Sequence, residues 1–258
     1  MKYAIITGAS SGFGQAIAFE LQNMGYGLVL FARRTDRLTA LKAELTQTDV
    51  YTATLDVRDE QAVKAAIAAL PTHIADNVHV LINNAGLAVG RGPLDQGLSD
   101  DWNRMLDTNV KGLLYMSHAV IPLLEKHPFS HLVNLSSIAG KEVYAGGNVY
   151  CASKHAVDAI SKALRIDLLS KQIKVCNIAP GAAETEFSLV RFKGDAQTAT
   201  QVYDGFDPLQ AEDIAQTVSF ILNTIKTALP LGLLRLILPH PKKTGMFIAL
   251  QVKMMNGN

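Results

Sequence analysis

Cysteine is scarce in this sequence of 258 residues, which contains only Cys151 and Cys176. Two cysteines cannot form a disulfide framework or a four-thiolate zinc site. No signal-peptide-like run precedes the first apolar segment, so we expect a protein of a reducing, cytoplasmic compartment. We also expect no metal site.

A large excess of either charge is missing too, because 24 Lys and Arg are matched by 23 Asp and Glu for a net charge of +1. Proteins that bind nucleic acid usually carry a broad basic surface, so we expect no nucleic-acid partner. The apolar run at residues 228–239 contains Gly232 and Arg235, and it is shorter than the roughly 20 apolar residues of a membrane-spanning helix. We therefore expect no stable membrane insertion.

The basic residues are unevenly distributed along the chain. From Lys226 to Asn258 there are five Lys and Arg and no acidic residue. Two interpretations of this tail stay open. Either the tail contains a buried final strand at residues 233–238 followed by an irregular segment packed on a neighbour, or it attaches loosely to an anionic membrane.

Short apolar runs alternate with longer helical patterns from the start of the chain. Short runs rich in β-branched residues are typical of buried strands, and apolar residues at helical spacing indicate amphipathic helices. Strands and helices that alternate through right-handed crossovers give a doubly wound parallel α/β sheet. The predicted strands cover residues 3–6, 28–31, 50–55, 78–82, 131–135 and 174–178, and the predicted helices cover residues 14–24, 37–45, 60–70, 101–126 and 149–170.

The chain shows no internal repeat and no low-complexity linker, and its length fits one α/β domain. We expect a single domain in which residues 1–225 form the main body and residues 226–258 add the final strand and the basic tail. The last predicted helix has an apolar residue at every fourth position, which forms one apolar stripe typical of an amphipathic helix. These positions are Ala152, Ala156, Ile160, Leu164 and Leu168.

A glycine-rich turn stands between the first predicted strand and the first predicted helix. Residues 7–14 read T-G-A-S-S-G-F-G, a variant of the dinucleotide-binding fingerprint. Glycines let the backbone approach a pyrophosphate, and the helix start offers free N–H groups. Ordinary turns use the same residues, but the position between strand and helix favours a nucleotide. The predicted contacts are Gly8, Ser10, Ser11, Gly12, Phe13 and Gly14.

No acidic residue stands at the end of the second predicted strand, where it would accept a hydrogen bond from the ribose 2′-hydroxyl of NAD. Arg33 and Arg34 stand there instead. Two guanidiniums suit a ribose 2′-phosphate, so we predict NADP as the cofactor. Without the glycine turn, a solvated pair of arginines at the start of a helix would explain them as well.

Further cofactor contacts are predicted where the third and fourth strands end. Asp56 could accept a hydrogen bond from an adenine amino group, although an Asp at a strand end also caps turns. Residues 83–86 read N-N-A-G, and the small residues let the backbone lie against a cofactor. The predicted contacts in these segments are Asp56, Val57, Asn83, Ala85 and Gly86.

Tyr150 and Lys154 lie four residues apart on the last predicted helix, so their side chains share one face. A phenol with a pKa near ~10 is a poor acid or base at neutral pH, and an adjacent ammonium favours its ionised form. We therefore expect Lys154 to lower the pKa of Tyr150. Ser137 ends the fifth predicted strand, and Asn109 lies in the middle of the preceding predicted helix.

Together and in this order, these motifs resemble the short-chain dehydrogenase/reductase family over about residues 3–225. The resemblance implies a Rossmann fold and hydride exchange between NADP and a CH–OH group of a small molecule. It also implies a homo-oligomer, a tetramer in this family, with the predicted helices 101–126 and 149–170 in contact. Further implied cofactor contacts are Tyr150, Lys154, Pro180, Gly181, Ala183 and Thr185.

The resemblance also implies catalytic roles for four side chains. Lys154 holds the nicotinamide ribose, and Tyr150 exchanges the proton with the substrate oxygen. Ser137 forms a hydrogen bond to that oxygen, and its spacing to Tyr150 selects it over Ser136. Asn109 holds a water molecule in the proton relay.

Residues 83–90, 144–150 and 185–195 resemble a narrower group, the NADP-dependent 3-hydroxy acid dehydrogenases that also oxidise serine. The resemblance implies a short 3-hydroxy acid as substrate. Arg191, in the loop expected to cover the nicotinamide, is the candidate ligand of its carboxylate, although an arginine there could instead pair within or between subunits. Two other functions stay open: a general aldehyde/ketone or 3-oxoacyl reductase, and a protein that senses NADP without turnover.

Overall fold

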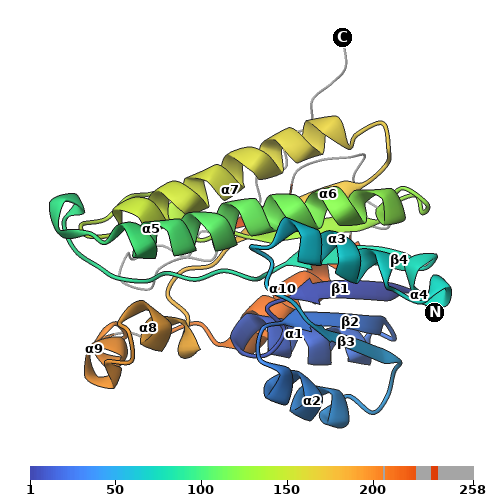
Figure 1. The fold of residues 1–258 in the computed structure, drawn as a ribbon, viewed down its shortest axis with the longest axis horizontal. Helices are drawn as coiled ribbons and strands as arrows, with labels where there is room; N and C mark the ends of the chain where they lie inside the picture. Colours follow the sequence, from blue (N-terminus) through green and yellow to red (C-terminus); the bar gives the residue numbers. More distant parts are fainter. Residues whose placement is uncertain (206, 225–233, 238–258) are drawn as a thin grey trace.

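The computed structural model describes residues 1–205, 207–224 and 234–237, and within them seven strands form one parallel sheet (Figure 1). The strand order is β3-β2-β1-β4-β5-β6-β7, which confirms the predicted doubly wound sheet. The strands are Tyr3–Thr7 (β1), Gly27–Ala32 (β2), Val50–Thr54 (β3), Val78–Asn83 (β4), His131–Leu135 (β5), Lys174–Ala179 (β6) and Leu234–Ile237 (β7).

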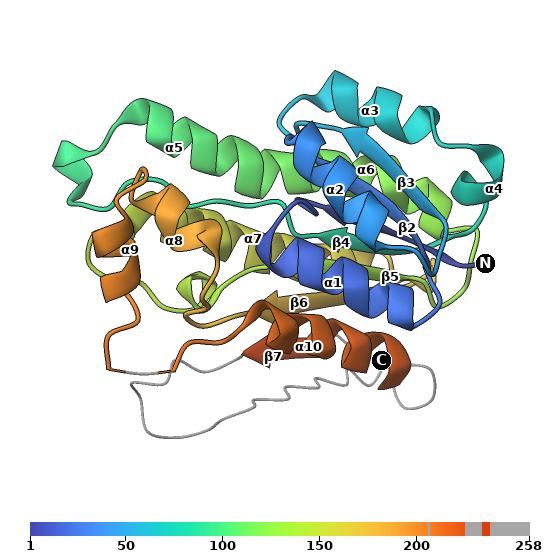
Figure 2. The same cartoon turned by 90° about the horizontal axis from the view of Figure 1, so that it is seen from below.

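Helices cover both faces of this sheet. Figure 1 shows α5, α6 and α7 on the opposite side of the sheet from α1 and α2, and α1 also packs against α10 (Figure 2). The helices are Gly12–Asn23 (α1), Thr35–Glu44 (α2), Glu60–Ala68 (α3), Thr72–Ala75 (α4), Ser99–Leu106 (α5), Leu113–Leu124 (α6), Asn148–Asp167 (α7), Glu186–Arg191 (α8), Ala196–Gln201 (α9) and Ala211–Thr224 (α10).

The two layers of helices explain why the central strands lack a polar alternation. Successive side chains of a strand point to opposite faces. In β1, Ala4 and Ile6 pack in the core beneath α1 and α10, whereas Ile5 packs in the core beneath α3 and α6. Because both faces are covered, all of β1 and β2 is buried, as expected for a parallel sheet.

The long helix predicted at residues 101–126 is wrong in one respect, because the structure divides it. Asp107–Gly112 forms a π-helical turn between α5 and α6. Gly112 faces the side chain of Val57, and a Cβ atom at Gly112 would lie 2.6 Å from its Cγ2 atom. Such π-helical turns are frequent at functional sites, and this one contains Asn109.

The apolar stripe of the last predicted helix is not the buried face of α7. Of the five predicted apolar positions, only Leu168 is buried, and Ala152 is exposed. The face that packs on the sheet is offset by one position and is largely polar, because it carries Ser153, Lys154 and Asp158. Small and charged groups therefore line the inner side of α7.

Helices α8, α9 and α10 fall where no helix was predicted. α8 and α9 lie together at one end of the molecule, beyond the sheet (Figures 1 and 2). The predicted final strand at residues 233–238 contains β7, which pairs with β6. The rest of that strand and the other residues of the basic tail lie outside the described residues. Among the described residues, no helix combines the length and the apolar character that crossing a bilayer requires.

The packing of α1 predicts a measurable loss of stability. Leu21 is fully buried, whereas Leu94 is 58% exposed. We expect Leu21→Ala to lower the free energy of unfolding by about 2–5 kcal/mol, because a buried cavity replaces the side chain. Leu94→Ala deletes the same atoms and is expected to change it by at most about 0.5 kcal/mol. Urea unfolding of both variants tests this, and equal losses would contradict the assigned core.

Candidate active site

A cleft of about 300 Å³ opens at the carboxyl ends of the strands. Its walls come from the ends of β1 and β4, neighbouring strands from which the chain winds in opposite directions. Such a switch point is where open α/β sheets bind their ligands. The lining residues that the sequence predicted are Gly8, Ser10, Ser11, Gly12, Phe13, Arg33, Arg34, Asp56, Val57, Ala85, Gly86, Ser137, Tyr150, Lys154, Pro180, Gly181, Ala183 and Thr185.

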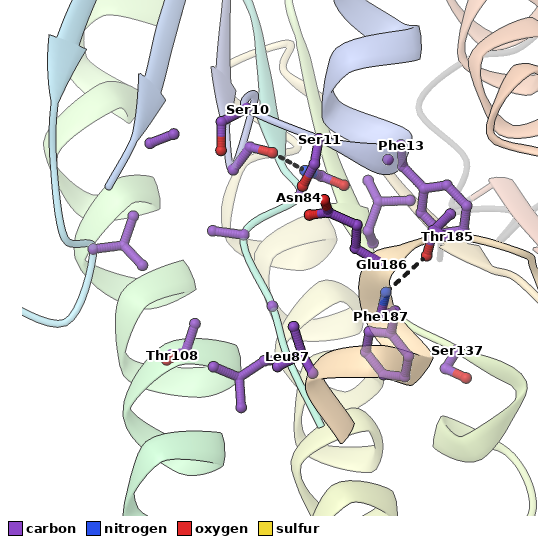
Figure 3. Close-up of a pocket in the computed structure, with 18 of the residues that line it drawn as sticks. Ser10, Ser11, Phe13, Asn84, Leu87, Thr108, Ser137, Thr185, Glu186 and Phe187 are labelled. Carbon is purple, nitrogen blue, oxygen red and sulfur yellow. Dashed lines mark hydrogen bonds between the residues drawn. The ribbon is translucent and has the colours of Figure 1, made fainter. Parts of the chain in front are cut away.

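Other lining residues escaped the sequence prediction. Figure 3 shows Asn84, Leu87 and Thr108 at the same opening as the β1–α1 turn and α8. The Thr108 hydroxyl is buried and has no hydrogen-bond partner among the described residues, which suits a polar ligand in the cleft. The remaining unpredicted lining residues are Ala32, Leu55, Leu135, Ser136, Glu186, Phe187 and Val190.

The glycine turn is fixed against the end of β4. Gly8 has a φ of +66°, a conformation that glycine adopts without strain. The side-chain amide of Asn84 donates to the carbonyl oxygens of Thr7 and Gly8 at 2.9 and 3.1 Å. Gly14 does not line the cleft, but any side chain there would collide with Gly8. Its predicted role as a contact is therefore replaced by a packing role beneath the turn.

Asn83, predicted to contact the cofactor, faces away from the cleft. Its Nδ2 atom donates to Ser117 Oγ and to Asn134 Oδ1, both at 2.9 Å, in the interior of the protein. Side chains alternate along a strand, so the next residue, Asn84, takes the position at the opening. The segment lies at the cleft, but the side chain that lines it belongs to Asn84 rather than to Asn83.

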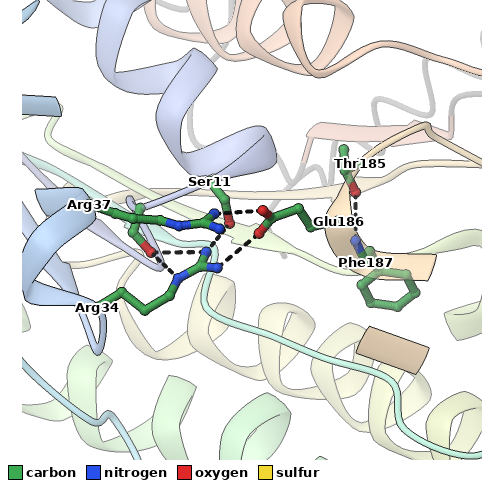
Figure 4. Close-up of polar contacts among 7 residues, drawn as sticks. Ser11, Arg34, Arg37, Thr185, Glu186 and Phe187 are labelled. Atoms are coloured by element: carbon green, nitrogen blue, oxygen red, sulfur yellow. Dashed lines mark hydrogen bonds and ion pairs between the residues drawn. The ribbon is translucent and has the colours of Figure 1, made fainter. Parts of the chain in front are cut away.

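Arg34 is held at one end of the cleft by several partners. Its Nη2 atom donates to Ser11 Oγ at 2.7 Å, and both Nε and Nη2 lie 3.3 Å from Ser10 Oγ. Its Nη1 atom forms an ion pair with Glu186 at 2.9 Å, and Arg37 reaches the other carboxylate oxygen at 2.6 Å (Figure 4). Arg37, and after it Arg34, hold the pKa of Glu186 below its usual value. Neither Arg37 nor Glu186 was predicted.

Asp56 lines the cleft next to these arginines but already has a partner. Its carboxylate accepts hydrogen bonds from Arg58 Nε and Nη2 at 2.9 and 2.5 Å. This pairing holds the pKa of Asp56 below its usual value, despite the opposing effect of burial. The group is therefore a carboxylate at neutral pH, and both of its oxygens already accept hydrogen bonds from Arg58.

Tyr150 and Lys154 meet at the other end of the cleft, both on α7. Lys154 Nζ donates to the carbonyl oxygen of Leu135 at 2.8 Å and lies 6.0 Å from the centre of the Tyr150 ring. Burial lowers the pKa of Lys154 to about 8, because a low-dielectric environment disfavours the ammonium. A Cβ atom at Gly86 would lie 3.4 Å from this Nζ atom.

The expectation that Lys154 lowers the pKa of Tyr150 is wrong for this structure. Burial dominates and raises the pKa of the phenol, while a hydrogen bond with Ser137 and the charge of Arg191 oppose that rise. The phenol is therefore protonated and can donate. Ser136 Oγ instead donates to the backbone carbonyl of Lys154, which favours Ser137 as the partner of Tyr150.

Asn109 is buried behind the cleft rather than in its lining. Its Oδ1 atom accepts from the Leu87 amide at 2.8 Å, and its Nδ2 atom donates to Leu87 O at 2.8 Å and to Ser153 Oγ at 3.0 Å. These contacts join the π-helical turn to the segment that follows β4 and to α7. The side chain therefore anchors that segment and α7 to the π-helical turn.

Arg191, at the end of α8, lies beside Tyr150 although it is not in the lining of the cleft. Its guanidinium carbon is 5.2 Å from the centre of the Tyr144 ring and 5.6 Å from that of Tyr150. Its Nη2 atom donates to the Tyr144 hydroxyl at 2.7 Å. The Nε atom is buried and has no hydrogen-bond partner among the described residues, so one directed donor remains for another group.

The switch-point cleft, the glycine turn and the paired Tyr and Lys are the arrangement of nucleotide-binding α/β enzymes. The protein-family model described as short chain dehydrogenase matches residues 2–195 of this chain. The chain therefore belongs to the short-chain dehydrogenase family, as its motifs indicated.

Individual proteins of known structure or activity resemble the chain over most of its length. It is 46% identical to sulfoacetaldehyde reductase 2 of Chromohalobacter salexigens over 84% of this chain and 86% of that protein. It is 44% identical to an NADP-dependent 3-hydroxy acid dehydrogenase of Salmonella typhi over 84% and 87% of the two chains. The closed form of serine dehydrogenase complexed with NADP⁺ superposes with a TM-score of 0.87 at 36% identity, over 98% of this chain and 100% of that one.

The buried amine of Lys154 predicts a pH-dependent stability. Its pKa is about 8 when folded and 10.5 ordinarily, so the unfolded chain binds more protons between these values. The free energy of unfolding should rise with pH across this window. Relative to Lys154→Met, we expect the wild type to gain about 1–2 kcal/mol between pH 7 and 9.5. Parallel urea-unfolding profiles for the two proteins would contradict a buried ammonium.

Proposed function

We propose that this chain is an NADP-dependent oxidoreductase that exchanges a hydride between the nicotinamide and the CH–OH group of a short 3-hydroxy acid. The observation that carries the proposal is that one cleft holds two different sets of side chains, one set at each of its ends. Arg34 with Ser10 and Ser11 offers donors to a phosphate at one end, and Tyr150 offers a phenol next to Arg191 at the other.

The residues of the cleft fit NADP. Gly8 lets the β1–α1 turn approach the end of β4, where an added Cβ atom would lie 2.9 Å from Ala85 Cα. The unpaired Thr108 hydroxyl offers a polar contact in the lining. Bound NADP supplies the hydride chemistry. By family resemblance, Lys154 holds the nicotinamide ribose.

The chain itself moves the proton and orients the substrate. Tyr150 donates its phenolic proton to the substrate oxygen when a carbonyl is reduced, and the resulting phenolate is the form that accepts a proton when a hydroxyl is oxidised. Ser137 donates a hydrogen bond to the same oxygen. Asn109 holds Leu87 and Ser153 in place behind these groups, and the family's relay water is assigned next to it.

Arg191 is the proposed ligand of the substrate's anionic group. Two observations support this role: its guanidinium carbon lies 5.6 Å from the centre of the Tyr150 ring, and its Nε–H has no hydrogen-bond partner among the described residues. A guanidinium binds a carboxylate with strong charge-assisted hydrogen bonds. It binds a sulfonate by the same contacts, so a second candidate substrate is sulfoacetaldehyde, on which a relative at 46% identity acts.

We also propose that the chain forms a cytoplasmic homo-oligomer. Leu106 and Leu114 are 38% and 41% exposed on α5 and α6, and Ile166 is 64% exposed on α7. These apolar side chains support the expected contact through the long helices. Cys151 and Cys176 are not joined in a disulfide, in keeping with a reducing compartment. We propose that residues 226–258 belong to the same domain. The pairing of β7, which lies within them, with β6 supports this.

Tyr150→Phe should abolish proton exchange while keeping the aromatic ring. We expect kcat to fall at least ~10²-fold, the contribution of general acid–base catalysis, with little change in NADP affinity. Tyr51→Phe removes a hydroxyl on β3, away from the cleft, and should leave kcat unchanged. Initial rates and a cofactor titration measure both effects, and a kcat near that of the wild type in Tyr150→Phe would remove Tyr150 from the mechanism.

The substrate class is tested by initial rates of NADP and NAD reduction with 3-hydroxybutyrate, serine, 2-hydroxyethanesulfonate and 2-butanol. We expect NADP to be preferred and an anionic alcohol to be preferred over 2-butanol. Arg191→Met should lower kcat/KM for the anionic substrate by roughly 10- to 150-fold, corresponding to about 1.5–3 kcal/mol for a charge-assisted bond.

The rate with 2-butanol serves as the internal control for Arg191→Met. A loss of both activities to the same extent would make Arg191 a structural residue. No preference for anionic alcohols in the wild type would reject the hydroxy-acid and sulfonate assignments together, and a preference for 2-hydroxyethanesulfonate would select the second candidate.

A further inference from the structure

The carboxylate of Glu186 occupies the cation cluster at the adenosine end of the cleft. It accepts from Arg34 Nη1 at 2.9 Å and from Arg37 Nη1 at 2.6 Å (Figure 4). Arg34 simultaneously donates to Ser10 and Ser11 in the glycine turn. One internal anion is therefore bound where two arginines and two hydroxyls converge.

The charge balance of this cluster changes when a second anion enters. Arg34 and Arg37 carry two positive charges, and Glu186 cancels one of them. A ribose 2′-phosphate adds close to two negative charges at neutral pH, and like charges a few ångströms apart repel each other. With Glu186 in its present place, the cluster of these three side chains and the phosphate would be left with a net negative charge.

Glu186 is placed so that it can give up Arg34 without disturbing the core. It is the first residue of α8, and its side chain is 41% exposed. Arg37 lies one turn further along α2 and contacts the other carboxylate oxygen. The carboxylate thus keeps one cationic partner when the other is lost, so the exchange leaves no buried unpaired charge.

Resting on the proposed use of NADP, we propose that Glu186 is a specificity-determining residue of the cofactor site, an internal competitor that the ribose 2′-phosphate displaces from Arg34. Its carboxylate lowers the affinity for a 2′-phosphorylated nucleotide below the value that the arginines alone would give. It has a smaller effect on a nucleotide that carries a free 2′-hydroxyl.

Calorimetric titration with adenosine 2′,5′-bisphosphate and with 5′-AMP tests this, because the two probes differ by the 2′-phosphate alone and neither carries a nicotinamide. We expect Glu186→Gln to bind adenosine 2′,5′-bisphosphate about three- to tenfold more tightly than the wild type at low ionic strength. Its affinity for 5′-AMP should change by less than about twofold, since that ligand lacks the competing anion.

Glu184→Gln is the matched control. It removes the same charge two residues earlier, from a side chain that is exposed and does not line the cleft, and it should reproduce both wild-type affinities. An equal gain in Glu184→Gln would mean that net charge alone acts, which would overturn the proposal.

The titrations of the wild type distinguish a failure of this proposal from a failure of the proposed use of NADP. If the wild type prefers adenosine 2′,5′-bisphosphate but Glu186→Gln shows no gain or a loss, Glu186 is not a competitor and the use of NADP stands. If neither the wild type nor Glu186→Gln prefers adenosine 2′,5′-bisphosphate to 5′-AMP, the phosphate site itself is absent, and both proposals fall.

Discussion

The junction between the β1–α1 turn and the end of β4 is the constraint on which the rest of the site depends. Asn84 bonds the carbonyl oxygens of Thr7 and Gly8, and the Thr7 hydroxyl accepts from the backbone amides of Asn84 and Ala85 at 3.1 and 3.0 Å. Two loops from opposite halves of the sheet are thereby fixed to each other. The absence of a side chain at Gly14 leaves the space that this junction needs.

From this junction the cleft extends in two directions with different chemistry. Toward β2 it offers exposed guanidiniums and hydroxyls, which interact with an anion in partly hydrated surroundings. Toward α7 it becomes buried, and Tyr150 and Lys154 are only 8% and 6% exposed. Burial disfavours charge on both side chains, so the same low dielectric that raises the pKa of Tyr150 lowers that of Lys154.

The sheet was predictable from the sequence because parallel strands buried on both faces are short, mostly apolar runs, and the predicted bounds of β5 match the structure. Helix α8 was not, since its six residues are too few to show a periodic pattern. Helix α10 could have been found, because Ile214, Val218 and Ile221 recur at helical spacing and are buried. The π-helical turn has no sequence pattern of its own, and it arises where Gly112 packs against Val57.

The parts of the site that depend on a backbone motif were predictable from the sequence. The parts that depend on the orientation of a side chain were less predictable. Asn83 and Asn84 are adjacent and identical in type, and only the pleat of β4 decides which one reaches the cleft. Glu186 and Arg37 lie 149 positions apart, so no local pattern connects them. The sign of the pKa shift of Tyr150 depends on its burial, which spacing alone does not reveal.

A crystal structure of the protein with NADP tests the central claim most directly, since that claim concerns which end of one cleft holds which end of the cofactor. The account predicts the 2′-phosphate within hydrogen-bond distance of the Arg34 guanidinium and the nicotinamide beside the Tyr150 hydroxyl. A cofactor bound in the reverse direction, or a 2′-phosphate without contact to Arg33 or Arg34, would contradict it.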